Sequence, residues 1–369
     1  MLALRGEHAL ACDAIMAAAK DAGIPTAEID GFASFGSDSL SPAVLQNTLR
    51  MKRLRTAAMA WHPGGGGSCG ALALASSAIE TGQADTVAVV RSICQRDGER
   101  YGLSNGGYRA LQDFNVPFGV FSPVTMMALV TQRYMHVNRA SQEDLGCVAV
   151  SIRQHARRNP RAMMRDRAMT LEDYLNSRLI ADPLRLLDCC LETDGACAVL
   201  VTTRERARDL ARPPVTILAA AVGCDQSWGA GVLGGYNTAD ELYITGNARD
   251  VAATLYSRAG VAPADIDVAQ IYDAFTIMVL LGLEDYGFCE QGAAATFVGA
   301  GEISWPDGSL PVNTAGGNLS EAYVQGLNHV VEGVRQLRGE SSSQVEAARI
   351  CLVTGGLSEG PTSGAILTV

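Results

Sequence analysis

One nine-residue passage occurs twice in this chain. Residues 22–30 read AGIPTAEID, and residues 259–267 read AGVAPADID. Each copy follows an alanine-rich amphipathic stretch and runs into a short apolar segment, which is the pattern of a helix, a turn and a strand. A unit of this kind that recurs once in 369 residues predicts two similar halves, whose paired segments face each other across an internal pseudo-twofold axis.

The two copies lead into different strand ends. The first continues as GFASF from residue 31, and the second continues as VAQIYDAF from residue 268. Polar side chains stand only at the second strand end, where Tyr272 and Asp273 occur. We therefore expect the functional side chains of the molecule to lie at the strand end of the second copy.

The composition is that of a well-buried globular protein, with 48% hydrophobic and 18% charged residues. A net charge of −10 disfavours a nucleic-acid partner, because phosphates demand a basic surface. No apolar run approaches a membrane span, and the first residues form a helix pattern with internal charges, unlike a signal peptide. We expect a cytoplasmic protein.

Ten cysteines raise the question of disulfides or metal. Cys189 and Cys190 are adjacent, the others are isolated within apolar runs, and no C-x-x-C pair exists. This spacing favours reduced, buried thiols and no metal site.

Strand and helix patterns interleave in both halves, which predicts the α/β class with layered sheets. The expected helices cover residues 7–23, 68–82, 247–260 and 320–338, and the expected strands cover 86–92, 349–354 and 364–369. Residues 194–210 read as a strand followed by a helix. The RPP sequence at 212–214 marks a boundary between an N-terminal half, 1–212, and a C-terminal half, 213–369. Residues 94–190, which carry a basic stretch from Arg153 to Arg167, read as an elaborated insertion.

Three motifs are candidate sites. Gly64-Gly65-Gly66-Gly67-Ser68 opens the 68–82 helix, and such a segment offers backbone N–H groups to an anion or oxyanion, or is only a tight loop. It lacks G-K-[ST], so it is not a Walker P-loop. The G-x-S-x-G sequence at 356–360 lies between two strands and predicts a β-turn, not the nucleophile elbow of a serine hydrolase.

The third motif, NTAGGNLSEAYVQG at 313–326, places a double glycine before a helix with Tyr323 in its first turns. A tyrosine in that place is, by itself, more often a packed amphipathic side chain than a catalytic group.

Together these segments resemble the thiolase superfamily over nearly the whole chain. Aligned through Gly82, the family's nucleophilic cysteine falls at Gly66 or Gly65, and Cys69 lies about one turn further into the helix. The family's His-Glu-Ala-Phe is matched by Tyr272-Asp273-Ala274-Phe275, and its final Cys-x-Gly by Thr354-Gly355-Gly356. Its Asn-x-x-Gly-Gly is matched by Asn313-Thr314-Ala315-Gly316-Gly317, with Tyr323 where the second histidine falls.

All four catalytic positions of the family are therefore replaced, and both histidine positions carry tyrosine. This combination resembles the thiolase-like aldolase subunits that cleave steroid side chains, relatives of the sterol-carrier thiolases often labelled lipid-transfer proteins. The resemblance implies retro-aldol cleavage of a β-hydroxyacyl-CoA into a ketone and a short acyl-CoA such as propionyl-CoA. It implies no cofactor beyond the coenzyme A of the substrate.

The resemblance also implies an architecture and an assembly. It implies a layered αβαβα sandwich with mixed five-stranded sheets and with residues 94–190 over the active site. It implies a homodimer through the N-terminal half, where the strand TVAVVRS would lie near a sheet edge, and a small OB-fold, zinc-ribbon partner that completes a heterotetramer. Family chains usually begin with a strand before the first helix, so we expect a truncated or misannotated start here, affecting the N-half sheet and not the site.

Retro-aldol cleavage needs a base at the β-hydroxyl, stabilisation of a thioester enolate and an acid for the α carbon. A free phenol has a pKa of about 10, so a tyrosine base must have a depressed pKa. We expect Tyr323 as the base and Tyr272 as the acid, although the sequence also allows the reverse. Backbone groups at Gly65, Gly66, Asn313, Gly316, Gly317, Gly355 and Gly356 are expected to bind the oxyanion or substrate, with Asp273 in a supporting role.

Two other functions remain open at the level of sequence. One is a non-catalytic pseudo-thiolase scaffold that binds an acyl-CoA or lipid and serves its partner. The other is a thiolase-like acyltransferase that uses another cysteine as its nucleophile.

Overall fold

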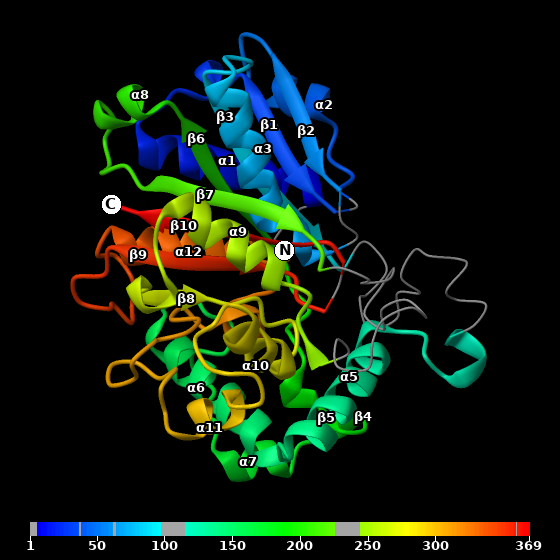
Figure 1. The fold of residues 1–369 in the computed structure, drawn as a ribbon. Helices are drawn as coiled ribbons and strands as arrows, with labels where there is room; N and C mark the ends of the chain where they lie inside the picture. Colours follow the sequence, from blue (N-terminus) through cyan, green and yellow to red (C-terminus); the bar gives the residue numbers. More distant parts are fainter. Residues whose placement is uncertain (1–5, 37, 62–63, 97–114, 226–243, 359) are drawn as a thin grey trace.

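The computed structural model describes residues 6–36, 38–61, 64–96, 115–225, 244–358 and 360–369 (Figure 1). Its frame is a pair of four-stranded sheets. The upper sheet has the order β2-β1-β3-β6, and the lower sheet has the order β7-β10-β9-β8. The strands of the two sheets are β1 Gly31–Phe35, β2 Thr56–Ala60, β3 Thr86–Cys94, β6 Asp194–Thr202, β7 Thr216–Gly223, β8 Val268–Gln270, β9 Ile350–Gly355 and β10 Thr362–Thr368.

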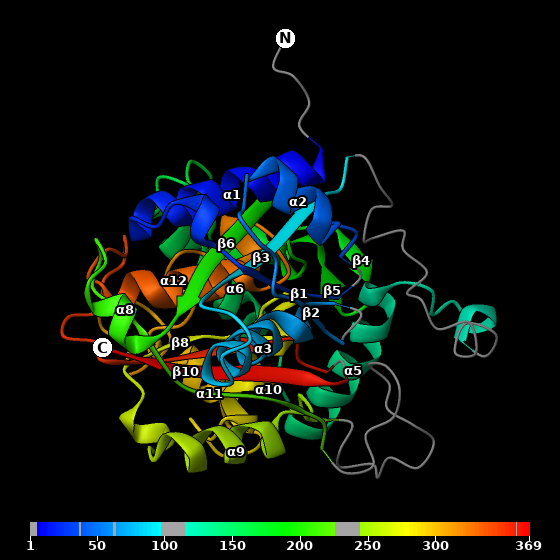
Figure 2. The ribbon, with the colours of Figure 1, turned by 90° about the horizontal axis from the view of Figure 1, so that it is seen from above.

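Helices cover both sheets and fill the space between them. Helix α1 (Glu7–Ala22) packs on the outer face of the upper sheet, and α9 (Arg249–Ala259) packs on the outer face of the lower sheet. Helices α3 (Ser68–Glu80) and α12 (Leu327–Leu337) lie between the sheets and contact both (Figure 2). The order helix, sheet, helix, sheet, helix confirms the predicted αβαβα sandwich.

The repeated turn makes the same hydrogen bonds in both halves. Asp30 accepts bonds from the two backbone N–H groups at the start of β3, each at 2.9 Å. Asp267 accepts bonds from the two backbone N–H groups at the start of β9, at 2.8 and 2.9 Å. A turn aspartate in each half thus joins the first strand after the turn to its parallel neighbour, and the duplication predicted from the sequence is structural.

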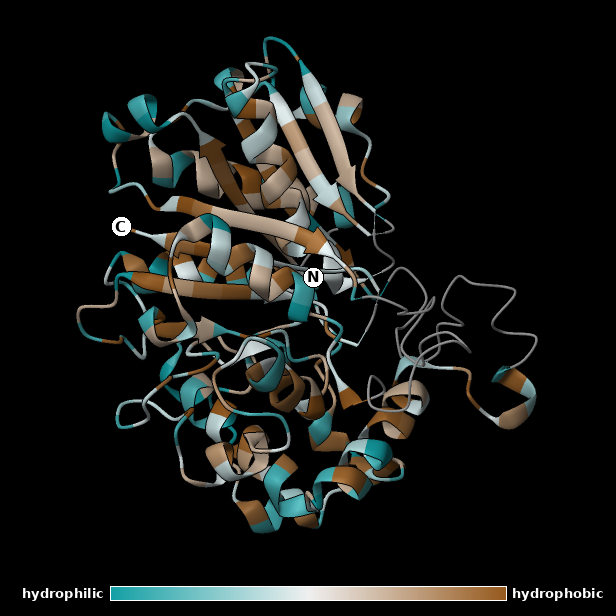
Figure 3. Cartoon of the chain, viewed as in Figure 1, coloured by the Kyte–Doolittle hydropathy of each residue, from teal (hydrophilic) through white to brown (hydrophobic). Residues whose placement is uncertain are grey.

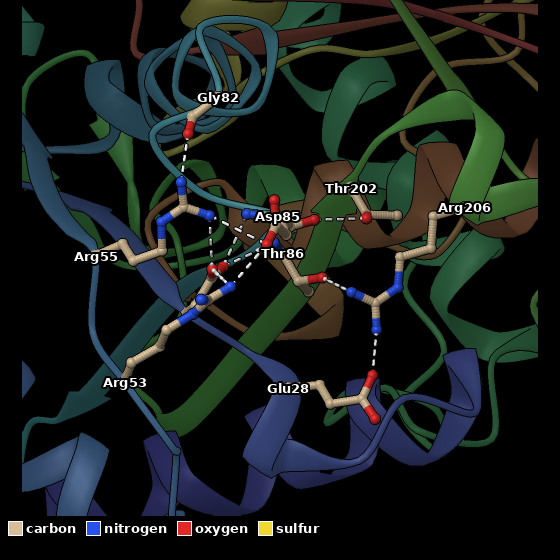
Figure 4. Close-up of polar contacts among 9 residues, drawn as sticks. Glu28, Arg53, Arg55, Gly82, Asp85, Thr86, Thr202 and Arg206 are labelled. Atoms are coloured by element: carbon tan, nitrogen blue, oxygen red, sulfur yellow. Dashed lines mark hydrogen bonds and ion pairs between the residues drawn. The ribbon is translucent and has the colours of Figure 1, made fainter.

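Further charged side chains surround the first copy of the turn (Figure 4). Arg53 and Arg55 lie 2.8 and 3.1 Å from Asp85, and Arg206 lies 2.6 Å from Glu28. These groups are partly exposed, so each pair contributes little to stability. They stand where β1, β2 and β3 begin and β6 ends, at the end of the sheet opposite to Phe35.

The described part of the insertion predicted at residues 94–190 packs against the C-terminal half. Its helices and short hairpin pack with α10 (Thr276–Asp285) and α11 (Ala294–Gly299) in the largest apolar core, at the bottom of Figure 1. These elements are α5 Pro123–Asn138, α6 Gln142–Arg158, α7 Leu171–Leu175, β4 Leu179–Ala181 and β5 Leu184–Arg185. Part of the predicted 94–190 region lies outside the described residues. The remaining described helices are α2 (Pro42–Thr48) and α8 (Arg204–Arg208).

Each sheet has four strands in the described residues, where five were predicted. Beyond β8, only a single bridge joins Ala269 to Val312. Pro311 has no N–H for a ladder, and Asn313 has a φ of 55°, so an extended strand does not continue there. In the upper sheet, no described strand lies beyond β6.

Two further predictions are wrong in detail. The strand TVAVVRS, predicted near a sheet edge, is part of β3, which lies between β1 and β6 and is interior, with β2 and β6 as the edges among the described strands. The helix predicted from residue 320 starts at Leu327, because Gln325 and Gly326 have φ values of 48° and 87°, which a right-handed helix does not allow. Tyr323 therefore precedes α12 and is not in its first turns.

Candidate functional site

The structure brings the two predicted tyrosines together. Tyr272 lies two residues beyond β8, and Tyr323 lies in the turn that leads into α12. Their hydroxyl oxygens are 3.1 Å apart, within hydrogen-bond distance. Both side chains are buried, with 1% of Tyr272 and 6% of Tyr323 exposed. A phenol that donates a hydrogen bond to its neighbour stabilises the neighbour's phenolate, which is the form that a tyrosine base needs.

Glycines make room for the ring of Tyr272. A Cβ atom on Gly65 would lie 2.1 to 2.2 Å from ring atoms and the hydroxyl of Tyr272, and a Cβ atom on Gly326 would lie 3.0 Å from the ring. Gly65 was predicted at this site, whereas Gly326 was not singled out. The start of the central helix α3 thus contacts the phenol only because its approach carries no side chains.

Gly355 and Gly356 bring the end of β9 against the same corner. A Cβ atom on Gly356 would lie 2.4 Å from the backbone nitrogen of Gly66, and one on Gly355 would lie 2.9 Å from the carbonyl oxygen of Gly65. The predicted glycines from positions far apart in the sequence therefore meet. Gly355 and Gly356 lie against the 3-10 turn Gly65–Gly67 at the N-terminus of α3, where the first backbone N–H groups of a helix can bind an oxyanion.

Asn313 holds the strand end that carries Tyr272. Its side-chain oxygen accepts a bond from the N–H of Ile271, and its amide donates to the carbonyl of Ile271, both at 2.8 Å. Both ends of the Asn313 amide are thus bonded to the backbone next to Tyr272. This geometry makes Asn313 a positioning residue.

Gly316 and Gly317 open a π-helical turn, Gly317–Glu321, with φ values of 108° and 54°. A Cβ atom on Gly317 would lie 2.1 Å from a carboxylate oxygen of Asp273. The two glycines therefore let the backbone turn closely around Asp273, one residue after Tyr272.

Asp273 forms a buried pair with His329 of α12. The Nε2 atom of His329 lies 3.0 Å from Oδ1 of Asp273, and that oxygen also accepts the N–H of Asn318 at 2.8 Å. The ring centroids of His329 and Tyr272 are 6.3 Å apart. Asp273 was predicted to support the site, but His329 was missed because the sequence shows it only as one of five histidines.

Two threonines fix the backbones of the tyrosines. The hydroxyl of Thr193 donates to the carbonyl of Tyr323 at 2.8 Å and accepts its N–H at 3.0 Å. The hydroxyl of Thr354 accepts the N–H of Tyr272 at 2.9 Å. Sequence reasoning noted Thr354 only as the residue in place of a family cysteine, and it missed Thr193.

Arg91 ties the N-terminal half to the turn that carries Tyr323. Its Nε donates to the side chain of Gln325 at 2.6 Å, and its Nη1 lies 3.5 Å from Asp38. Only 3% of the Arg91 residue is exposed. A buried charge of this kind persists only when it is paired and hydrogen-bonded, so the contact is specific.

Cys69 is not poised as a nucleophile. It is fully buried in the first turn of α3, its thiol lies 3.5 Å from the carbonyl oxygen of Val353, and burial raises its pKa to about 12. The thiolate is the reactive form of cysteine, and this setting suppresses it. The acyltransferase alternative thus has no support from Cys69.

The G-x-S-x-G sequence at 356–360 lies between β9 and β10, where residues 357, 358 and 360 form bends and residue 359 is outside the described residues. Ser358 is buried in the left-handed region with a φ of 56°, and its hydroxyl bonds to the carbonyl of Thr245 at 3.3 Å. No helix follows, so the geometry of a nucleophile elbow is absent from these described residues.

Among the residues that the structure describes, no group of three or more His, Cys, Asp or Glu side chains is placed to hold a metal ion. Within the same part of the chain, no helix is both long and apolar enough to cross a membrane. The expectation of no cofactor stays a prediction.

Comparison with known proteins identifies strong similarities. The model of the thiolase C-terminal domain-like family matches residues 235–365. The chain is 40% identical to a 17-hydroxy-3-oxo-4-pregnene-20-carboxyl-CoA lyase of Mycobacterium tuberculosis, over 98% of this chain and 94% of the lyase. It is also 40% identical to a steroid side-chain-cleaving aldolase of Thermomonospora curvata, over 98% of this chain and 93% of the aldolase.

Solved structures agree. The Ltp2-ChsH2(DUF35) aldolase superposes with a TM-score of 0.93 at 39% identity, covering 99% of this chain and 93% of that chain. A human mitochondrial 3-ketoacyl-CoA thiolase, at 15% identity, superposes with a TM-score of 0.68 over 98% of this chain and 92% of its own, which shows the fold alone. The chain therefore belongs to the thiolase superfamily, in the branch that contains the steroid side-chain-cleaving aldolases.

Proposed function

We propose that this chain is a carbon–carbon lyase that cleaves the side chain of a steroid CoA thioester by a retro-aldol reaction. The observation that carries the proposal is the buried pair Tyr272 and Tyr323, whose hydroxyls are 3.1 Å apart at the two positions where thiolases carry histidine. Relatives with full-length similarity are named as a steroid acyl-CoA lyase and a steroid side-chain-cleaving aldolase. These relatives support the substrate class.

The chemistry follows from a substrate with a tertiary hydroxyl on the β carbon. A base removes the hydroxyl proton, the oxygen forms a ketone, and the Cα–Cβ bond breaks. The released electron pair moves into the thioester as an enolate, and an acid then protonates the α carbon. One proton leaves and one returns, so the step needs no oxidant, reductant or water.

The two phenols divide these proton transfers. We assign Tyr323 as the base and Tyr272 as the acid, and the hydrogen bond between them lets one phenol stabilise the phenolate form of the other. The reverse assignment uses the same contacts. Thr193 and Thr354 fix the two backbones, so the hydroxyls stay aligned through the reaction.

We call Gly65, Gly66, Gly355 and Gly356 the glycine corner. It supplies a place for the enolate oxygen. Backbone N–H groups at Gly65 and Gly66 begin the turn that runs into α3, and Gly355 and Gly356 lie against them. We assign oxyanion stabilisation to these groups, since donors at a helix N-terminus favour developing negative charge. Asn313 holds the backbone next to Tyr272. Gly316 and Gly317 let the backbone turn closely around Asp273.

We also propose that this chain binds a partner protein. The similar solved structure is named as a complex with a DUF35 protein, and we propose that a small partner of the predicted OB-fold, zinc-ribbon type completes a heterotetramer here. We place the homodimer contact at β2, since the predicted strand is interior. Among the described strands β2 is an edge of the upper sheet, and Met59 within it and Trp61 just after it are 50% and 89% exposed. We keep a cytoplasmic location as part of the same proposal.

The direct test uses the purified chain with its partner and a steroid CoA thioester that carries a β-hydroxyl. We expect equal amounts of a steroid ketone and a short acyl-CoA, measured by mass spectrometry. Binding of the thioester without any cleavage, with or without the partner, would instead indicate the non-catalytic scaffold.

A further inference from the structure

Two cysteines pack beside the candidate site, and both keep their protons. Burial raises the pKa of Cys69 to about 12. Burial of its sulfur, together with the neighbouring Cys189 and Asp273, raises the pKa of Cys190 well above the usual range of a thiol. The thiolate is the form that attacks a thioester, so an acyl-CoA bound here is not transferred to either sulfur. It stays a thioester whose α carbon is open to acid–base chemistry.

The hydrogen bond between the two buried phenols stabilises one negative charge on the pair. The hydroxyls of Tyr272 and Tyr323 are 3.1 Å apart. Figure 3 draws β9, the strand that carries Thr354 to Tyr272, largely in the brown of hydrophobic residues. Burial by itself disfavours a phenolate, so the bond from the second phenol is what stabilises it in these apolar surroundings. When the pair holds one proton, that proton moves along the bond and either oxygen becomes the base.

The ring of Tyr272 is held in one position. A Cβ atom on Gly65 would lie 2.1 to 2.2 Å from its outer atoms, and one on Gly326 would lie 3.0 Å from the ring, so the backbone at both glycines packs directly against it. The hydroxyl of Thr354 accepts the N–H of Tyr272 at 2.9 Å. With the ring packed and the backbone bonded, the phenol meets a bound acyl group from one side only.

We propose that this site has a second activity, the exchange of one α-hydrogen of a short acyl-CoA with solvent in the absence of any ketone. The substrates are CoA thioesters of short acids that carry hydrogen on the α carbon, such as propionyl-CoA. The activity is the reverse of the α-carbon protonation assigned to Tyr272, so it rests on that part of the proposed function. Because Tyr272 acts from one side, only one of the two α-hydrogens of propionyl-CoA exchanges.

Each bond change in the exchange is balanced. The phenolate of Tyr272 takes a proton from the α carbon, and the electron pair of the broken C–H bond moves into the thioester as an enolate, whose oxygen lies at the N–H groups of Gly65 and Gly66. Solvent hydrogen enters the pair through Tyr323, whose exposed fraction of 6% exceeds the 1% of Tyr272. It reaches Tyr272 along their hydrogen bond. The α carbon then takes up this hydrogen, and Tyr272 is a phenolate again.

The test incubates the purified chain and its partner with propionyl-CoA in D₂O, with no ketone present. We expect mass spectrometry to find one deuterium in each acyl group and not two, and NMR to place it on the α carbon. Tyr272→Phe should slow the exchange by about 100-fold or more, and Tyr323→Phe by about 10-fold, because Tyr272 is still present. The matched control is Tyr256→Phe on α9, which removes a hydroxyl that bonds to the carbonyl of Tyr286 at 2.8 Å and should leave the rate unchanged.

Absence of deuterium in the wild-type reaction would overturn the inference, as would two deuteriums in each acyl group or undiminished exchange by Tyr272→Phe. Cleavage of a steroid CoA thioester by the same preparation separates this inference from the proposed function. Cleavage without exchange would refute the second activity and leave the proposed function intact. Exchange without cleavage would support the second activity and count against the proposed function, and the loss of both would refute both.

Discussion

The two halves of the molecule place different groups at the same point of the same scaffold. Aligned on the repeated turn, Phe35 at the end of β1 corresponds to Tyr272 beyond β8. Phe35 packs against Gly67 and lies under the guanidinium of Arg91, 5.7 Å from the ring centre. Tyr272 packs against Gly65, and its hydroxyl reaches Tyr323.

The comparison separates what the duplication supplies from what was added to it. Both halves provide a turn, a strand and an aromatic ring at the strand end, and both rings pack against glycines of the same turn, Gly65–Gly67, of the N-terminal half. Only the C-terminal half adds the hydroxyl, the Asp273–His329 pair and a second tyrosine. The N-terminal half contributes Gly65, Gly66 and Arg91, so residues of both halves meet at the candidate site, while the proposed proton transfers use only the C-terminal half.

The largest expected effect comes from making the two halves alike. Tyr272→Phe gives both strand ends a phenyl ring, and Tyr323→Phe removes the partner hydroxyl. Each should lower kcat by about 100-fold or more, because a proton-transfer group is lost, while the melting temperature changes little. Steady-state kinetics and thermal unfolding measure the two effects.

The matched control for these variants is Phe35→Tyr, which adds a hydroxyl at the equivalent point of the other half. We expect no rescue when it is combined with Tyr272→Phe, because the added hydroxyl stands at the other strand end and does not restore the contact between Tyr272 and Tyr323. Normal turnover by both single phenylalanine variants would show that the tyrosines only fill space.

The next effect tests the glycine that faces Tyr272. Gly65→Ala places a methyl group 2.1 Å from the phenol, so the ring must move, and we expect kcat to fall by about 10-fold or more. Gly299→Ala is the control, since a Cβ atom there meets nothing within 4 Å. A crystal structure of Gly65→Ala with Tyr272 unmoved, together with wild-type turnover, would contradict this role.

A smaller effect is expected from the buried pair behind Tyr272. Asp273→Asn leaves the side-chain volume almost unchanged and removes the charge that faces His329. As a positioning pair, it should lower kcat by about 10-fold while leaving KM nearly constant, which steady-state kinetics measures. Wild-type kcat alongside reduced stability would indicate a purely structural pair.

The smallest expected effect is a change in the unfolding free energy with pH. Burial, reinforced by Glu332, raises the pKa of Glu321 from 4.5 to about 7. The folded protein therefore binds this proton more tightly than the unfolded chain, and that stabilisation is complete below pH 4.5 and is lost as the pH rises to about 7. We expect the unfolding free energy to fall over this window by on the order of 1 kcal/mol or more per such group.

Glu321→Gln should flatten that slope without abolishing it, because burial also raises the pKa of Asp285 to about 7. Urea unfolding at several pH values measures the slope. A slope of opposite sign in the wild-type protein, or an unaltered slope in the variant, would contradict the assignment.

Much of this architecture was accessible from the sequence because the repeat and its apolar neighbours are local signals. The meeting of Tyr272, Tyr323 and the glycine segments was accessible only through the family pattern. His329, Thr193 and Gln325 were missed, since their roles come from contacts between segments far apart in the chain. The late start of α12 was missed because residues 320–326, SEAYVQG, contain no proline to end a helix, and the sequence does not show that the backbone at Gln325 and Gly326 leaves the helical region.

The most direct measurement of the central claim is cleavage in D₂O by the chain and its partner, followed by mass spectrometry of products and protein. The account predicts a ketone together with a short acyl-CoA that carries one new deuterium at the α carbon, and no acyl adduct on the enzyme. Cys69→Ala should give the same products at a similar rate. An acyl group found on a cysteine, with activity lost in Cys69→Ala and kept in both phenylalanine variants, would contradict the account and restore acyl transfer.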